Sequence, residues 1–201
     1  MARTSGTLTV GSGASLVFGT LGNTGGNAFT IPNSVFTSAP TLTNWTVERT
    51  NKLTLGNQGI TLTGTLTLTA GEFDIGNNTL NINGSLSVTS GSITAAGSST
   101  VVVGGSGAQL SIPNNTFGSN SVVNFTLNRG NGALLNGTFT VSGTVTFTSG
   151  NITTGDNTVI VGSGGSVSQT SGHVVGNLRK SVGTGAGIAK TFEVGTGSDY
   201  T

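Results

Sequence analysis

The sequence predicts an all-β protein: a parallel β-solenoid (β-helix) with coils of about 20 residues, followed by a short non-solenoid β tail. Three observations lead to this prediction. Apolar residues alternate with Thr or Ser in short runs, Gly and Asn interrupt these runs, and the same run returns once per coil. Alternation assigns side chains to opposite faces of a strand, and a fixed period of this length is typical of stacked repeats.

The short repeat is clearest in four runs that share the alternation and a closing glycine. They are 65–71 (TLTLTAG), 85–91 (SLSVTSG), 144–150 (TVTFTSG) and 166–172 (SVSQTSG). The step from the first run to the second, and from the third to the fourth, is the length of one coil, with small changes in the loops. A second strand is expected later in the coil, at 78–82, 99–103 and 157–161.

A longer repeat relates two blocks of the chain. Residues 44–49 match residues 124–129 at an offset of 80, and residues 76–80 match residues 155–159 at an offset of 79. Four coils of the short repeat give this spacing, so we expect four coils to separate the matched strands.

Stacking explains why such short strands would be stable. Thr, Val and Ile favour the pleated conformation, while Gly and Asn accept the tight corners between strands. A single strand cannot bury its apolar face, but coils stacked about 4.8 Å apart pair each strand with its neighbours and enclose a continuous interior. An antiparallel sandwich or barrel is the alternative, but it does not predict the same strand at one fixed spacing.

The pattern divides the chain at Gly172. Residues 1–172 are expected to form the solenoid, and residues 173–201 a C-terminal cap or the start of a following β domain. The tail loses the coil spacing and carries five of the thirteen formal charges, namely Arg179, Lys180, Lys190, Glu193 and Asp199. A solenoid needs an atypical, polar terminal unit to protect its last coil. We also expect the chain to be part of a longer protein.

Composition argues against several classes of function. Only 6% of the residues are charged and the net charge is +1, so no basic stripe is available for nucleic acid. No apolar run approaches the roughly 20 residues that span a bilayer, so no membrane span is expected. The chain has no cysteine, and stacked coils need no disulfides.

The candidate chemical groups form no catalytic constellation. Glu72 and Asp74 are two residues apart on one predicted strand, which is typical of an exposed acidic pair, with a weak cation site as the alternative. His173 is the sole histidine and has no Cys or acid nearby in the sequence. Trp45 and its repeat partner Phe125 are expected to pack in the core. We therefore predict no enzymatic activity, no catalytic residue, no metal site and no cofactor.

The best candidate for a binding site is a face of hydroxyl side chains. If all of them point outward, they form flat ranks of the kind that bind ice or glycan. The nine residues are Thr65, Thr67, Thr69, Ser85, Ser87, Thr89, Thr144, Thr146 and Thr148. The alternative is that Thr is simply a well-suited strand residue at a solvated surface.

Three segments resemble repeats of very large surface proteins of Bacteroidetes-type bacteria. They are 143–159 (GTVTFTSGNITTGDNTV), 124–129 (NFTLNR) and the tail at 172–180 (GHVVGNLRK) with 192–196 (FEVGT) and Tyr200. The resemblance implies a cell-surface or extracellular location, export by a type IX route, and a structural or adhesive role as a stalk or filament. The partners it implies are another copy joined end to end, the rest of a longer chain, or a surface or glycan ligand.

Overall fold

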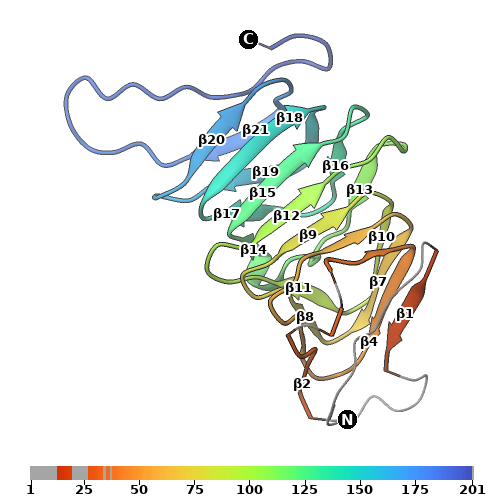
Figure 1. Cartoon of the computed structure of the whole chain (residues 1–201). Helices are drawn as coiled ribbons and strands as arrows, with labels where there is room; N and C mark the ends of the chain where they lie inside the picture. Colours follow the sequence, from red (N-terminus) through yellow and green to blue (C-terminus); the bar gives the residue numbers. More distant parts are fainter. Residues whose placement is uncertain (1–12, 20–26, 34, 37, 201) are drawn as a thin grey trace.

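The computed structural model describes residues 13–19, 27–33, 35–36 and 38–200. It confirms the predicted fold class. The chain is 50% strand and 2% helix, and its parallel sheets form a β-solenoid of about seven turns with about 20 residues per turn (Figure 1). In its first four coils each turn visits three sheets, which we call the first, second and third faces in chain order.

The first and second faces are four-stranded sheets. The first face consists of β1 (Ser15–Phe18), β4 (Asn44–Glu48), β7 (Thr65–Ala70) and β10 (Ser85–Val88). The second face consists of β2 (Phe29–Thr30), β5 (Leu53–Thr54), β8 (Glu72–Asp74) and β11 (Ser92–Thr94). Both sheets end at the fourth coil, so neither runs the length of the solenoid.

The third face alone is continuous along the described solenoid, with seven parallel strands. These are β3 (Thr41–Leu42), β6 (Ile60–Leu62), β9 (Thr79–Ile82), β12 (Thr100–Val103), β15 (Asn124–Asn128), β18 (Thr144–Ser149) and β20 (Ser166–Gln169). Because β12 pairs with both β9 and β15, this sheet joins the two halves of the molecule.

A fourth sheet takes over the remaining sides of the later coils. It contains β13 (Leu110–Ile112), β16 (Ala133–Leu135), β14 (Ser121–Val122), β17 (Phe139–Val141), β19 (Ile152–Val161) and β21 (Val174–Lys180). β19 serves two sides, because its start pairs with β16 and its end with β17. A short 3-10 helix, η1 (Gly118–Asn120), lies in the fifth coil between β13 and β14.

The interior is filled by the apolar members of the alternating runs. In β7 and β18 the Leu, Val and Phe positions are buried, while the Thr positions between them are more accessible. Trp45 and Phe125 are both 0% exposed, which confirms the prediction that they pack in the core. Trp45 lies against Phe18 and Phe73, at ring-centroid distances of 4.8 and 5.4 Å.

The long repeat does not return to the same face, which corrects the expected spacing of four coils. β4 lies on the first face, whereas its repeat partner β15 lies on the third. The chain passes from β4 to β7, from β7 to β10 and from β10 to β13 in three turns. It reaches β15 two sides of the solenoid after β13, so the two matched strands are separated by less than four full turns. The physical reason is a longer coil: β13 starts 25 residues after β10, whereas β7 and β10 start 21 and 20 residues after the preceding strands of the first face.

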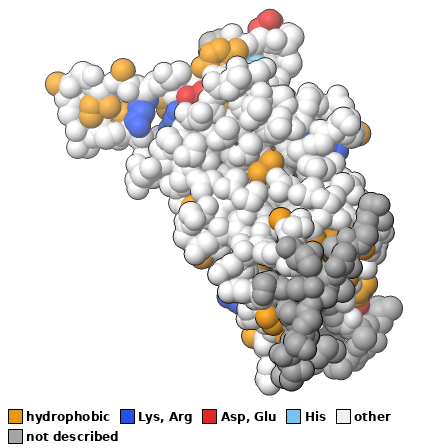
Figure 2. Space-filling model, viewed as in Figure 1, with side chains coloured by type: hydrophobic (Ala, Val, Ile, Leu, Met, Phe, Trp, Pro, Cys, Tyr) orange, Lys and Arg blue, Asp and Glu red, His pale blue; other side chains and the backbone are white. Residues whose placement is uncertain are grey.

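The parallel sheet continues past the boundary expected at Gly172. β21 pairs in parallel with β19, from Val174 through Lys180, so the departure from the coils comes after Lys180. The residues beyond then fold back, where Val194 forms a bridge with Val174 and the Lys180 ammonium contacts Glu193 at 2.8 Å. Figure 2 shows charged side chains gathered at this C-terminal end, while most of the remaining face in view is uncharged.

Candidate functional site

The nine hydroxyl residues predicted as one face lie on two. Six belong to the first face, on β7, on β10 and at Thr89 directly after β10. The other three, Thr144, Thr146 and Thr148, lie on β18 of the third face. Since the two sheets are different sides of the solenoid, the structure does not bring the nine residues together. Each face carries a shorter hydroxyl rank of its own.

On each of the two faces, the first hydroxyl of the rank is hydrogen-bonded to a hydroxyl of the next coil. Thr65 Oγ1 lies 2.9 Å from Ser85 Oγ on the first face, and Thr144 Oγ1 lies 3.1 Å from Ser166 Oγ on the third. These hydroxyls therefore link successive coils.

An asparagine stands at the start of the preceding strand in both ranks. Asn44 Oδ1 accepts a hydrogen bond from the Thr65 amide at 2.8 Å, and Asn124 Oδ1 accepts one from the Thr144 amide at 2.9 Å. The two blocks thus share the same local contact although their strands lie on different faces.

The acidic pair on β8 already has a cation. Lys52 Nζ lies 3.3 Å from Asp74 Oδ2 and 3.5 Å from Glu72 Oε2. The hydrogen bond and charge of Asp74, with a smaller contribution from Glu72, raise the pKa of Lys52 above its usual value. The lysine ammonium occupies the place that a weakly bound cation would take. In the described part of the chain, no three His, Cys, Asp or Glu side chains are grouped as a metal site would require.

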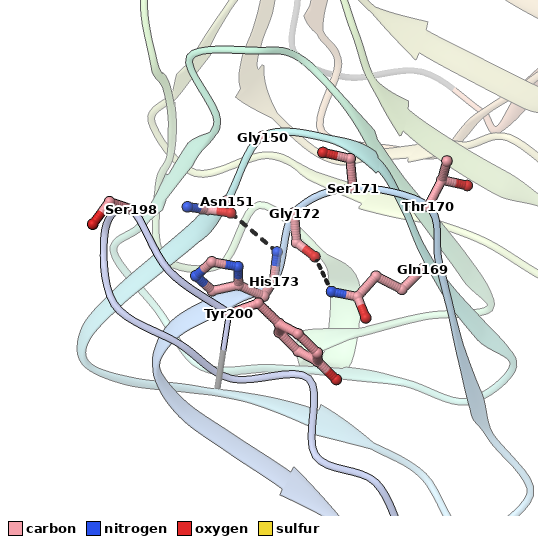
Figure 3. Close-up of a pocket in the computed structure, with 9 residues that line it drawn as sticks. All are labelled: Gly150, Asn151, Gln169, Thr170, Ser171, Gly172, His173, Ser198 and Tyr200. Carbon is pink, nitrogen blue, oxygen red and sulfur yellow. Dashed lines mark hydrogen bonds between the residues drawn. The ribbon is translucent and has the colours of Figure 1, made fainter.

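A pocket at the C-terminal end of the solenoid is lined by the sole histidine, the sole tyrosine and several amide and hydroxyl side chains (Figure 3). Its volume is about 510 Å³. One wall is the corner after β18, a second is the corner after β20, and the third is the tail. The lining residues are Gly150, Asn151, Gln169, Thr170, Ser171, Gly172, His173, Ser198 and Tyr200.

His173 lines this pocket and is held by its neighbours. It is 4% exposed, and its backbone amide donates to Asn151 Oδ1 at 3.0 Å (Figure 3). Its Nε2 lies 2.6 Å from the carbonyl oxygen of Thr196, and since a carbonyl only accepts, Nε2 carries the proton. The imidazole therefore fastens the tail to the last coil.

The pocket can bind a neutral polar group, but the described residues that line it include no carboxylate and no nucleophile paired with a base. Asn151 and Gln169 supply amides, and the ring of Tyr200, which is 47% exposed, stands 5.9 Å from the His173 ring. The sequence hypotheses missed this pocket because Asn151 and Tyr200 lie far apart in the chain. A usable signal was the single histidine at the point where the coil spacing ends.

Comparisons with known proteins add no identification: no family model, no curated protein and no solved structure matches this chain. In the described part of the chain, no helix has the length and apolar character needed to cross a membrane.

Proposed function

We propose that this chain is an extracellular structural module of a bacterial surface protein, a stalk or filament-forming segment with an adhesive role, and not an enzyme. The observation that carries the proposal is the parallel stacking itself. Seven turns at a strand spacing of about 4.8 Å give a rod of about 34 Å whose strands pair along its axis. Such a rod is extended by adding coils, whether from the same chain or from another copy.

The end of the third face supports axial extension. β20 pairs with β18 on one side, and within the described residues no strand pairs with its other edge. An unpaired strand edge is a template for a further strand. The tail covers a different part of the same end, through the bridge between Val174 and Val194. The C-terminal end is therefore only partly closed.

The chemistry of the side chains supports a structural role over a catalytic one. The carboxylates of Glu72 and Asp74 are paired with Lys52, and the imidazole of His173 is committed to the tail. Low charge also favours stacking, since rods with few charges repel one another weakly.

Electron microscopy of the purified chain, together with its mass in solution, tests the proposal. We expect end-to-end fibres, and we expect Ser168→Lys on the edge strand β20 to shorten them, because an edge lysine opposes strand addition. Thr146→Lys is the matched control, since Thr146 is the register partner of Ser168 on the interior strand β18. Compact particles without a long axis, or turnover of a polysaccharide, would contradict the proposal.

An ice- or glycan-binding face is the second candidate. The observation that favours it is an outward rank on the third face, in which Thr126, Thr146 and Ser168 are register partners on successive strands. Thermal hysteresis of the wild-type chain, lost in Thr146→Lys, is the expected result for ice binding. The absence of thermal hysteresis in the wild type would contradict ice binding and leave the structural role standing.

A further inference from the structure

A groove opens where the first face ends. β13 follows β12 in the chain as β10 follows β9, yet no backbone hydrogen bond joins β10 to β13 in the described part of the chain. Instead β13 pairs only with β16. The gap forms a groove of about 740 Å³, lined by the corner between β6 and β7, the corner between β9 and β10, and the Gly-rich loop that precedes β13.

Arg129 reaches into this groove from the corner after β15. The residue is 4% exposed, and its guanidinium bonds three backbone carbonyls. Nε donates to Ala108 at 2.7 Å, and Nη1 donates to Gly104 at 2.6 Å and to Asn83 at 3.0 Å. Two of its three nitrogens are thereby committed to the corners of earlier coils.

The third nitrogen, Nη2, is free. It makes no hydrogen bond within the described part of the chain, and no carboxylate there lies within ion-pair distance of Arg129. Burial lowers the pKa of this guanidinium, but an arginine remains protonated at neutral pH. A buried positive charge without a counter-charge is unfavourable, so the site favours an anion that supplies one.

The walls of the groove favour a sugar as the carrier of that anion. Hydroxyls come from Thr65, Ser85 and Ser106, and amides come from Asn83 and Gln109. These groups can donate to and accept from sugar hydroxyls, and none of the described residues lining the groove is acidic. Nη2 offers two N–H groups, and the oxygens of one sugar carboxylate can accept both hydrogen bonds.

We propose that this groove binds a carboxylate-bearing sugar chain of the uronate class, with Arg129 Nη2 donating to the carboxylate. The binding site lies on the side of the rod and does not depend on end-to-end assembly. A chain that forms no fibres would still bind the sugar, so sugar binding and the structural role are tested independently.

Ser106→Asp tests the site without removing the Arg129 clamp. Ser106 is exposed in a Gly-Ser-Gly loop of the groove, and an aspartate there repels the ligand and offers the guanidinium a carboxylate of its own. Ser163→Asp is the matched control, since Ser163 is exposed in another Gly-Ser-Gly loop that does not line the groove. Arg129→Gln is the direct variant, with far-UV circular dichroism to verify that the solenoid is retained.

The probes are tetragalacturonate, neutral tetragalactose and tetraglutamate, each titrated by calorimetry. We expect tetragalacturonate to bind the wild type, to bind Ser106→Asp at least about 10-fold more weakly, and to bind Ser163→Asp as it binds the wild type. Tetragalactose and tetraglutamate should bind at least about 10-fold more weakly than tetragalacturonate. The proposal is overturned by no binding of tetragalacturonate, by equal binding to Ser106→Asp, or by equal binding of either other probe.

Discussion

The two blocks of the solenoid are alike in their contacts and different in their placement. Asn44 and Asn124 each accept a hydrogen bond from the first amide of the next coil's strand, at 2.8 and 2.9 Å. The first contact lies on the first face and the second on the third. Contact between neighbouring coils is therefore encoded locally, by the residues at matching positions, whereas the face depends on the lengths of the intervening coils.

The interiors show the same relation. In the first block Trp45 packs between Phe18 and Phe73, and in the second Phe125 packs against Phe117 and Phe139. Each block thus has an aromatic cluster within three coils. Because a solenoid is held together by contacts between adjacent coils, each cluster should stabilise its own block first.

The largest expected effect comes from Phe125→Ala. Removing a fully buried Phe costs about 3–5 kcal/mol of unfolding free energy. Far-UV circular dichroism during denaturant unfolding should show a transition at lower denaturant, while the fluorescence of Trp45, the sole tryptophan, should move less because it reports on the first block. Ile188→Ala, in the exposed tail, is the control and should change neither signal by more than about 0.5 kcal/mol. Equal shifts of both signals would show that the blocks unfold as one unit.

The next effect concerns a corner that both blocks share. Gly71 and Gly150 follow the matched strands β7 and β18, with φ of 71° and 79°. A Cβ would lie 2.0 Å from the Arg49 carbonyl oxygen in one case and 1.9 Å from that of Arg129 in the other. Alanine at either site should therefore cost about 1–3 kcal/mol through backbone strain, and more where the clash is not relieved.

The control for this corner is Gly155→Ala, which shares the positive φ, at 54°, but meets no atom within 4 Å. Thermal unfolding of the three variants separates strain from collision. We expect Gly71→Ala and Gly150→Ala to lower the unfolding midpoint by similar amounts, and both to lower it more than Gly155→Ala does. A clear difference between the first two would mean that the corner depends on its face.

The sequence predicts the coil and its contacts but not the change of face. Alternation in 65–71 and 144–150 gives the strand, the inward side chains and the closing glycine, because these depend on neighbouring residues. The face depends on the summed lengths of the coils, and the long loop between β12 and β13 adds residues without changing the alternation of the strands. The groove at Arg129 is missed for the same reason, since this loop forms one of its walls.

Substitution by aspartate should affect stability differently at Asn44 and at Asn124. Both Asn44→Asp and Asn124→Asp keep the accepting oxygen. Asn44 Nδ2 donates to Ser15 Oγ at 3.1 Å, and that hydroxyl can turn to donate to a carboxylate. Asn124 Nδ2 donates to the Ser99 carbonyl at 2.9 Å, which cannot donate. We expect Asn124→Asp to cost about 1–2 kcal/mol in denaturant unfolding and Asn44→Asp less than about 0.5 kcal/mol. Equal costs would contradict the difference in partners.

The smallest effect is a pH dependence confined to the first block. Lys52 lies between Glu72 and Asp74, whereas the second block has Gly132, Asn151 and Thr153 at the matching positions, none of them charged. The pKa of Lys52 is raised in the folded state, so its contribution is fully present below the unfolded pKa of about 10.4 and is lost as the pH rises through the folded pKa.

The midpoint of thermal unfolding, followed by Trp45 fluorescence between about pH 9 and 12, should therefore fall at the alkaline end. The fall should be smaller in high salt, because the ion pairs are exposed and salt screens them. Lys52→Gln is the matched variant: its midpoint should lie slightly below that of the wild type under about pH 10.4, and it should lack the extra loss above that pH, so that the two curves converge at the alkaline end. The comparison between blocks predicts that Lys52→Gln alters the Trp45 signal and not the unfolding of the second block. If Lys52→Gln changed only the unfolding of the second block, the assignment of the ion pairs' contribution to the first block would be contradicted.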